Sequence, residues 1–206
     1  MPRVQSFKDL GVTFDHQLKF DQHISSILKK AFSMLGFIIR TSRHFSHIES
    51  IILLYKTLVR SNLEYASIIW NPSTKTQVDA LEKVQRKLTR FIYRKFHYPY
   101  QDYETRLKTL NLQSLHVRRC SIDLKYLYKI VNGLLSTTTI SEMPMRLNMK
   151  NVRNMQLFGV KKYNTNLVKN STVPRLLNTY NDLFSGCNLF NLPISEFMKI
   201  VNQSIK

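Results

Sequence analysis

Residues 24–39, ISSILKKAFSMLGFII, place an apolar side chain at every third or fourth position. Side chains with this spacing share one face of an α-helix, so the stretch predicts an amphipathic helix with one side on a core. Gly36 interrupts the helix at a cost of about 1 kcal/mol relative to alanine, and we expect it to permit close packing of another helix. Several later segments repeat this helical period, so the sequence predicts a mainly helical fold.

The segments that follow predict more helices. Ser46 and Glu49 have the spacing of a capping box, in which each side chain accepts a hydrogen bond from an N–H group at a helix start. A helix is therefore predicted to begin there and to end before Pro72. Further helices are predicted over residues 76–95, 103–110, 115–135 and 195–205.

The two ends of the chain depart from the helical period. Leu10, Val12 and Phe14 alternate with polar or small residues around Gly11, which is typical of a half-buried strand. After Leu135 the apolar period weakens and prolines interrupt it, which predicts an irregular wrap with one late helix. The predicted fold is therefore mainly α, with a short β segment over 1–19, a helical bundle over 20–135 and an irregular C-terminal region over 136–206.

The chain is strongly basic, with 31 Lys and Arg residues against 13 Asp and Glu residues and a net charge of +18 at pH 7. Such a charge favours an anionic partner, nucleic acid first and an anionic membrane surface second. The N-terminus is too polar for a signal peptide, and the apolar runs are too short to span a bilayer. We therefore expect an intracellular protein that is neither secreted nor membrane-spanning.

The positive charge is most concentrated on the predicted helix over 76–95. At about 100° per residue its basic side chains form one stripe, and apolar side chains occupy much of the remaining surface. Such a ridge fits a phosphate backbone and would bind it with strong salt dependence. A solvated basic face without a ligand is the alternative, and a helix lying on a membrane is less favoured. The candidate phosphate contacts on this helix are Lys83, Arg86, Lys87, Arg90 and Arg94.

A second basic site is predicted on the long helix over 115–135. Because adjacent arginines point about 100° apart, only one of Arg118 and Arg119 can share a ligand with the lysines that follow. The other arginine could equally pair with Asp123 or Glu104 inside the protein.

The sequence shows no constellation of residues for catalysis. A polymerase or nuclease site needs clustered carboxylates to hold two divalent metals, and the 13 acids here are scattered. His44 and His47 have no third ligand nearby, and there is no glycine-rich phosphate loop. We therefore expect no catalytic residue, no metal site, no cofactor and no small-molecule substrate for this chain.

Three stretches of the sequence carry a resemblance to a known family. They are residues 7–15, FKDLGVTFD, residues 58–72, LVRSNLEYASIIWNP, and residues 81–91, LEKVQRKLTRF. Together they resemble the region after the catalytic palm in reverse transcriptases of non-LTR retrotransposons, jockey-like elements especially. The resemblance extends over nearly the whole chain.

The resemblance implies a primer grip and a thumb. The Leu-Gly turn would belong to the primer grip, a β-hairpin that seats the 3′ end of a primer, and the helices over 20–135 would form a thumb on the minor groove of an RNA–DNA duplex. Residues 63–70 are expected in the core, with base stacking by Trp70 as the less favoured alternative. The primer-grip-like residues are Lys8, Asp9, Leu10, Gly11 and Val12. The second set of phosphate contacts that it implies is Lys29, Lys30, Arg40 and Arg43.

The resemblance also implies what this chain does and does not do. The family's aspartates, which hold Mg²⁺, lie in a palm upstream of the hairpin, so we expect this chain alone to be inactive in DNA synthesis. The expected partners are an RNA–DNA hybrid or a DNA duplex, and the palm of a polymerase, in the nucleus or the cytoplasm. Two alternatives remain open: a basic nucleic-acid-binding protein retained by the host, and a fragment that depends on the missing palm.

Overall fold

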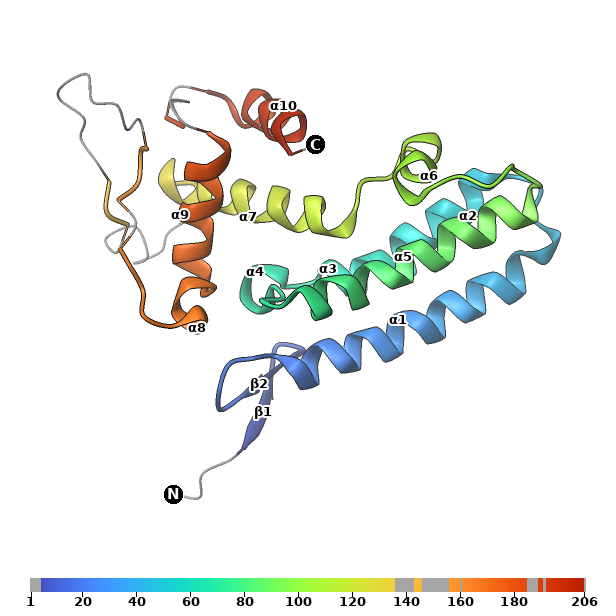
Figure 1. Ribbon diagram of the computed structural model, residues 1–206, viewed down its shortest axis with the longest axis horizontal. Coiled ribbons are helices and arrows are strands. Elements are labelled where there is room, and N and C mark those ends of the chain that lie inside the picture. The colour runs from blue at the N-terminus through green and yellow to red at the C-terminus, as the bar shows by residue number, and fades with distance from the viewer. Residues whose placement is uncertain are drawn as a thin grey trace. The chain divides into compact units, whose positions relative to one another are not determined.

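The computed structural model describes residues 5–135, 143–145, 156–159, 161–184, 189–190 and 192–205. The chain forms two compact units, residues 1–116 and residues 117–206. Each unit has its own apolar core, and the described fold as a whole is mainly helical, as the sequence predicts (Figure 1). The boundaries drawn from the sequence, after residues 19 and 135, stay predictions.

The N-terminal segment is a two-stranded antiparallel sheet, β1 (Ser6–Asp9) and β2 (Val12–Asp15). A two-residue turn joins the strands, and both of its residues have positive φ, 44° at Leu10 and 86° at Gly11. Turns of this kind match the twist of paired strands and suit glycine, whereas a leucine in the left-handed region costs about 1–2 kcal/mol. Leu10 is nevertheless 83% exposed, so neither packing nor intrinsic preference explains its place at the tip.

The helices of the first unit surround one core. Buried side chains of α1 and α5 provide much of that core, and α1 packs along α5 and against the π-helical turn. The elements of this unit are α1 (Asp21–Thr41), a 3₁₀ turn (Ser42–His44), α2 (Ile48–Leu54), a π-helical turn (Tyr55–Arg60), α3 (Ser61–Glu64), α4 (Ser67–Trp70), α5 (Lys75–Lys95) and α6 (Tyr103–Thr109).

The predicted position of the capping box is wrong. The capping box does not form at Ser46 and Glu49, because α2 begins one residue later than the box requires, with His47 as an N-cap that makes no side-chain hydrogen bond. A capping box forms instead at the start of α5, where Gln77 N–H donates to Thr74 Oγ1 at 3.3 Å.

Gly36 does not mark a close approach of two helices. A Cβ atom built there would meet only the Arg40 guanidinium, at 3.4 Å, within 4 Å. That contact is with the far end of a flexible side chain on the same helix. The structure therefore provides no packing reason for glycine at this position.

The C-terminal unit is more helical than the sequence predicts. Pro174 was expected to break the helical period, but it lies in the first turn of α9, where a helix needs no N–H donor. The predicted irregular wrap over 136–206 lies partly outside the described residues. The helices after α6 are α7 (Leu115–Val131), α8 (Asn166–Lys169), α9 (Thr172–Leu183) and α10 (Ile194–Ser204).

Aromatic rings fill much of the C-terminal core. The Tyr128 and Phe197 rings stack with centroids 5.2 Å apart, and Tyr180 packs edge-on to Phe158 at 5.4 Å. After α7, Gly133 adopts a φ of 68° and lets the chain turn away. Within the described part of the chain, no helix combines the length and the apolar character that crossing a bilayer requires.

Candidate nucleic-acid interface

Helix α5 presents the basic stripe that the sequence predicts. Its inner face carries Leu81, Val84, Leu88 and Ile92, all fully buried in the core of the first unit. The segment from residue 83 to residue 95 contains no acidic residue. We define the ridge as the four basic side chains that are exposed on the opposite face, Lys83, Lys87, Arg90 and Arg94.

Arg86 differs from the four residues of the ridge. Its side chain is half-buried, and its guanidinium carbon lies 5.1 Å from the centre of the Tyr103 ring on α6. This cation–π contact holds Arg86 at the edge of the ridge. On the other edge, Lys87 Nζ lies 5.7 Å from the centre of the Phe32 ring on α1.

A hollow lies beside the ridge, between α5, the loop over 96–102 and α6. Arginines from two helices and tyrosines from the loop face it together, although no pattern in the sequence connects them. The only signal in the sequence is Tyr98-Pro99-Tyr100 shortly after the basic helix. We call it the arginine–tyrosine hollow, and its lining is Arg86, Arg90, Tyr93, Arg94, Tyr98, Pro99, Tyr100, Gln101, Asp102, Tyr103 and Arg106.

The primer-grip-like residues lie in three different environments. Lys8 and Gly11 line a small hollow together with Lys30 of α1 and Tyr65. Asp9 and Leu10 are exposed at the hairpin tip, so they are free to contact another molecule. Val12 is buried in the core of the first unit, so the prediction that it belongs to a binding site is not supported by its placement.

Hydrogen bonds attach the hairpin to the rest of the first unit. Tyr65 Oη donates to the Leu10 carbonyl at 2.9 Å, and the Thr13 N–H donates to His23 Nδ1 at 3.3 Å. Burial, and then the positive charge of Lys8, lower the pKa of His23. His23 is therefore neutral at pH 7, with Nδ1 as an acceptor and the proton on Nε2.

The remaining predicted contacts on α1 are accessible. Lys29, Lys30 and Arg40 are all exposed, and only Lys30 lines a hollow shared with the hairpin. Arg43, in the short turn after α1, is also exposed, and its carbonyl accepts a hydrogen bond from Lys95 Nζ at 2.8 Å.

Trp70 belongs to the core. Its side chain is fully buried, its Nε1–H donates to the Tyr65 carbonyl at 2.7 Å, and its ring lies edge-on to His23 at 5.3 Å. Base stacking needs an exposed ring, so that alternative for Trp70 is wrong and its expected core position is confirmed. Tyr65 and Ile69, in the same stretch 63–70 that was expected in the core, are exposed.

The second predicted basic site, on α7, is only partly accessible to a ligand. Arg119 is fully buried in the described structure. Asp123 accepts a hydrogen bond from Arg175 Nε at 2.9 Å, an ion pair between α7 and α9 that the sequence did not indicate.

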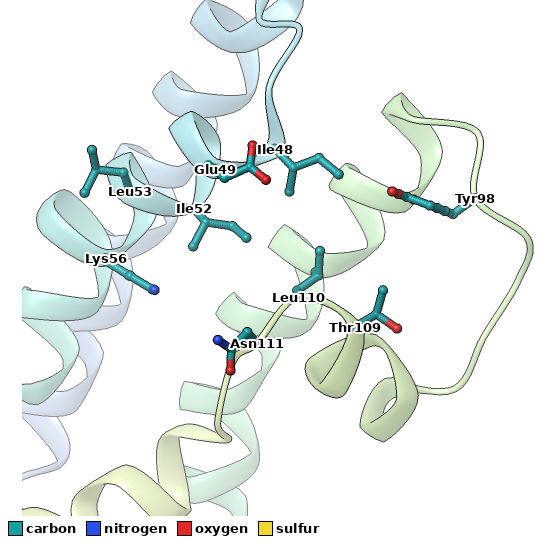
Figure 2. Close-up of a pocket in the computed structure, with 9 residues that line it drawn as sticks. All are labelled: Ile48, Glu49, Ile52, Leu53, Lys56, Tyr98, Thr109, Leu110 and Asn111. Atoms are coloured by element: carbon teal, nitrogen blue, oxygen red, sulfur yellow. The ribbon is translucent and has the colours of Figure 1, made fainter.

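A groove also lies between α2 and the end of α6. Figure 2 shows Ile48, Ile52 and Leu110 facing the same space, with Glu49 and Lys56 on the side of α2. Tyr98 reaches this groove as well as the arginine–tyrosine hollow. Its lining is mostly apolar, and its single acid and single lysine form no cluster for acid–base or metal chemistry.

The described residues offer no metal centre. Among them, no three His, Cys, Asp or Glu side chains gather closely enough to hold an ion. The arrangement of basic and aromatic side chains on the first unit is suited to contact with phosphates and bases.

Comparisons with known proteins add little to this geometry. The chain is 26% identical over 136 residues to the uncharacterized protein B0403.1 of Caenorhabditis elegans, a match that covers 65% of this chain and 68% of that protein. No family model matches the sequence. No solved structure matches it.

Proposed function

We propose that this chain binds a nucleic-acid duplex, an RNA–DNA hybrid or DNA, through the ridge on α5. The observation that carries the proposal is the exposure of Lys83, Lys87, Arg90 and Arg94 on one face of a helix whose other face is core. Because the core fixes the helix, the backbone that spaces the four charges needs no ordering at binding.

The length of the ridge suits a phosphate backbone. Residues 83 and 94 are eleven positions apart, which corresponds to roughly 16 Å along a helix. One strand of duplex DNA carries a phosphate about every 3.4 Å along its axis, so the ridge is long enough to follow about five phosphates. A contact of this kind reads the shape of the duplex and carries no base sequence.

The resemblance to non-LTR reverse transcriptases fits this role, and we propose that the first unit acts as a thumb. In that role the ridge holds the duplex in register, and the hollow at the hairpin, with Lys8 and Lys30, adds a second phosphate contact. The described residues do not fit a divalent metal, so no catalytic step is assigned to them.

The experiment is a salt titration with a charge-matched control. The ridge variant replaces Lys83, Lys87, Arg90 and Arg94 with Gln, and the control variant replaces Lys19, Lys108, Lys161 and Lys169, which are also exposed, with Gln. Each lost phosphate contact removes about 0.9 from the slope of log affinity against log salt on a B-form duplex. We therefore expect the slope of the ridge variant to be smaller by about 3–4, with a much smaller change in the control.

The outcomes distinguish binding through the ridge from binding that depends only on the net positive charge. Equal losses in the two variants would mean that binding depends on net charge alone. An unchanged slope in the ridge variant would remove α5 from the interface. Fluorescence of Trp70, the single tryptophan and a core residue of the first unit, checks that this unit remains folded in both variants.

A second candidate role is that of a helical piece that functions only in contact with the palm of a polymerase, and the hairpin favours this role. Phe7 is 59% exposed and Leu10 is 83% exposed, whereas Val12 and Phe14 pack on the core of the first unit. Exposed apolar side chains on a short sheet are suited to contact with another domain. A cooperative thermal unfolding transition of this chain, followed by circular dichroism, would argue against a fragment that cannot fold alone.

A further inference from the structure

We propose that the arginine–tyrosine hollow binds one unpaired nucleotide next to the duplex, with its phosphate on the arginines and its base on the exposed tyrosine ring. The proposal rests on the proposed function, because Arg90 and Arg94 belong both to the ridge and to the lining of the hollow. Binding in the hollow would make the chain prefer a duplex that ends in a single strand, a preference that the ridge alone cannot provide.

The charge in the hollow favours an anion. Four arginines line it, three from α5 and Arg106 from α6, against the single carboxylate of Asp102. That carboxylate is already engaged as the N-cap of α6, where it accepts the N–H groups of Glu104 at 3.1 Å and Thr105 at 3.2 Å. The hydroxyl of Thr105, followed by these N–H groups, lowers the pKa of Asp102, so it stays ionised and keeps its role as the cap.

The hollow contains a buried arginine. Arg106 is only 5% exposed, its Nη1 donates to the Gln101 carbonyl at 3.1 Å, and its guanidinium lies 5.8 Å from the centre of the Tyr103 ring. Arg86 lies against the same ring. In both arginines the Nε is buried and has no hydrogen-bond acceptor among the described residues. A phosphate in the hollow would bring negative charge and acceptor oxygens to two cations that have few protein acceptors.

The loop supplies rings for a base. Tyr100 is 95% exposed and makes none of the ring contacts found for the tyrosines beside it. The Tyr98 ring is held 5.1 Å from the Tyr93 ring, and Tyr93 Oη donates to Gln101 Oε1 at 2.7 Å. These contacts fix the loop, so Tyr100 projects from a defined support. Stacking on such a ring tolerates any base.

The size and place of the hollow fit one nucleotide. Its volume is about 620 Å³, within the roughly 300–1,000 Å³ of small-molecule sites. Bases inside a duplex are paired and stacked, so only an unpaired base can reach a protein ring. A strand that leaves the duplex held on the ridge would pass directly into the hollow through the shared arginines.

The test compares a blunt RNA–DNA hybrid, the same hybrid with a short single-stranded overhang, and the free single strand, by fluorescence anisotropy. The native chain is expected to bind the overhang substrate more tightly than the blunt one. Tyr100→Ala should remove that advantage, a loss of about 5- to 150-fold for one stacked base, while blunt binding stays unchanged. Tyr100→Phe, which keeps the ring, should retain the advantage, and Phe37→Ala, which removes an exposed ring on α1, should not affect it.

The outcomes distinguish the two proposals. Intact blunt binding without any overhang advantage overturns the hollow and leaves the ridge. If the blunt hybrid does not bind, the ridge proposal fails, and single-strand binding that Tyr100→Ala abolishes still supports the hollow. An overhang advantage that survives Tyr100→Ala, or the absence of any binding that depends on Tyr100, overturns the inference.

Discussion

A buried polar network inside the first unit gives a sharp test of the fold that positions the ridge. Tyr55 Oη donates to Gln85 Oε1 at 2.9 Å, and Gln85 Nε2 donates to Tyr103 Oη at 3.1 Å and to the Gln113 carbonyl at 2.9 Å. Tyr103 Oη in turn donates to Glu82. Burial raises the pKa of Tyr55 well above its ordinary value, so the hydroxyl keeps its proton. The network joins α5, which carries the ridge, to three other segments.

Tyr55→Phe removes one hydroxyl and keeps the ring. Tyr55 and Gln85 are both fully buried, so the substitution leaves Gln85 Oε1 without this donor in a site that water does not reach. Leaving a buried acceptor unpaired costs about 1–3 kcal/mol. With a urea dependence of about 2 kcal/mol per molar, the unfolding midpoint should fall by about 0.5–1.5 M.

The assay follows the first unit alone. Trp70 is the single tryptophan and lies in the first core, so its fluorescence in a urea titration reports the unfolding of that unit. Tyr100→Phe serves as the control, because Tyr100 is exposed and removing its hydroxyl should not move the midpoint. A Tyr55→Phe midpoint equal to that of the unmodified chain would refute the account of the network.

Three further substitutions test local features of the first unit, each by the same urea titration. Gly36→Ala should raise the free energy of unfolding by up to about 1 kcal/mol, because a Cβ there meets only the flexible Arg40 side chain; a clear loss would reveal a close packing contact. Leu10→Asn should raise it by about 1 kcal/mol, because asparagine tolerates the positive φ of this turn; no gain would show that the turn is not strained. Burial lowers the pKa of His23, so its contribution to the free energy of unfolding is complete above pH 6.5 and is lost as the pH falls through the folded pKa. His23→Gln should weaken this pH dependence of stability, and a pH profile identical to that of the unmodified chain would contradict the prediction.

The helical part of the fold could be predicted well from the sequence. The apolar period of residues 24–39 and the stripe on residues 76–95 depend on nearest neighbours along one helix, and both helices form with the expected exposed faces. The α9 helix was missed because Pro174 was interpreted as a break, although proline is tolerated in a first helical turn. The capping box at Ser46 failed because a cap depends on where the helix begins, which the spacing alone does not fix.

The candidate site was predictable only in part. The ridge lies on a single helix, so counting by the helical period was enough to find it. The arginine–tyrosine hollow needs Arg106 and Tyr103 of α6 to face α5 across a loop, and no local pattern encodes that meeting. Val12 was assigned to a contact surface through the resemblance, but alternation along β2 places it in the core.

The central claim, that the ridge binds a duplex, is tested most directly by fluorescence anisotropy of the unmodified chain across a salt series. The probes are an RNA–DNA hybrid, a DNA duplex and single-stranded DNA. The four phosphate contacts of the ridge contribute about −3 to −4 to the log–log slope on the DNA duplex, and the account predicts a slope at least this steep, with tighter binding of the hybrid. Failure to bind any of the three at moderate salt, or a slope near zero, would contradict the account and leave the ridge as a solvated surface.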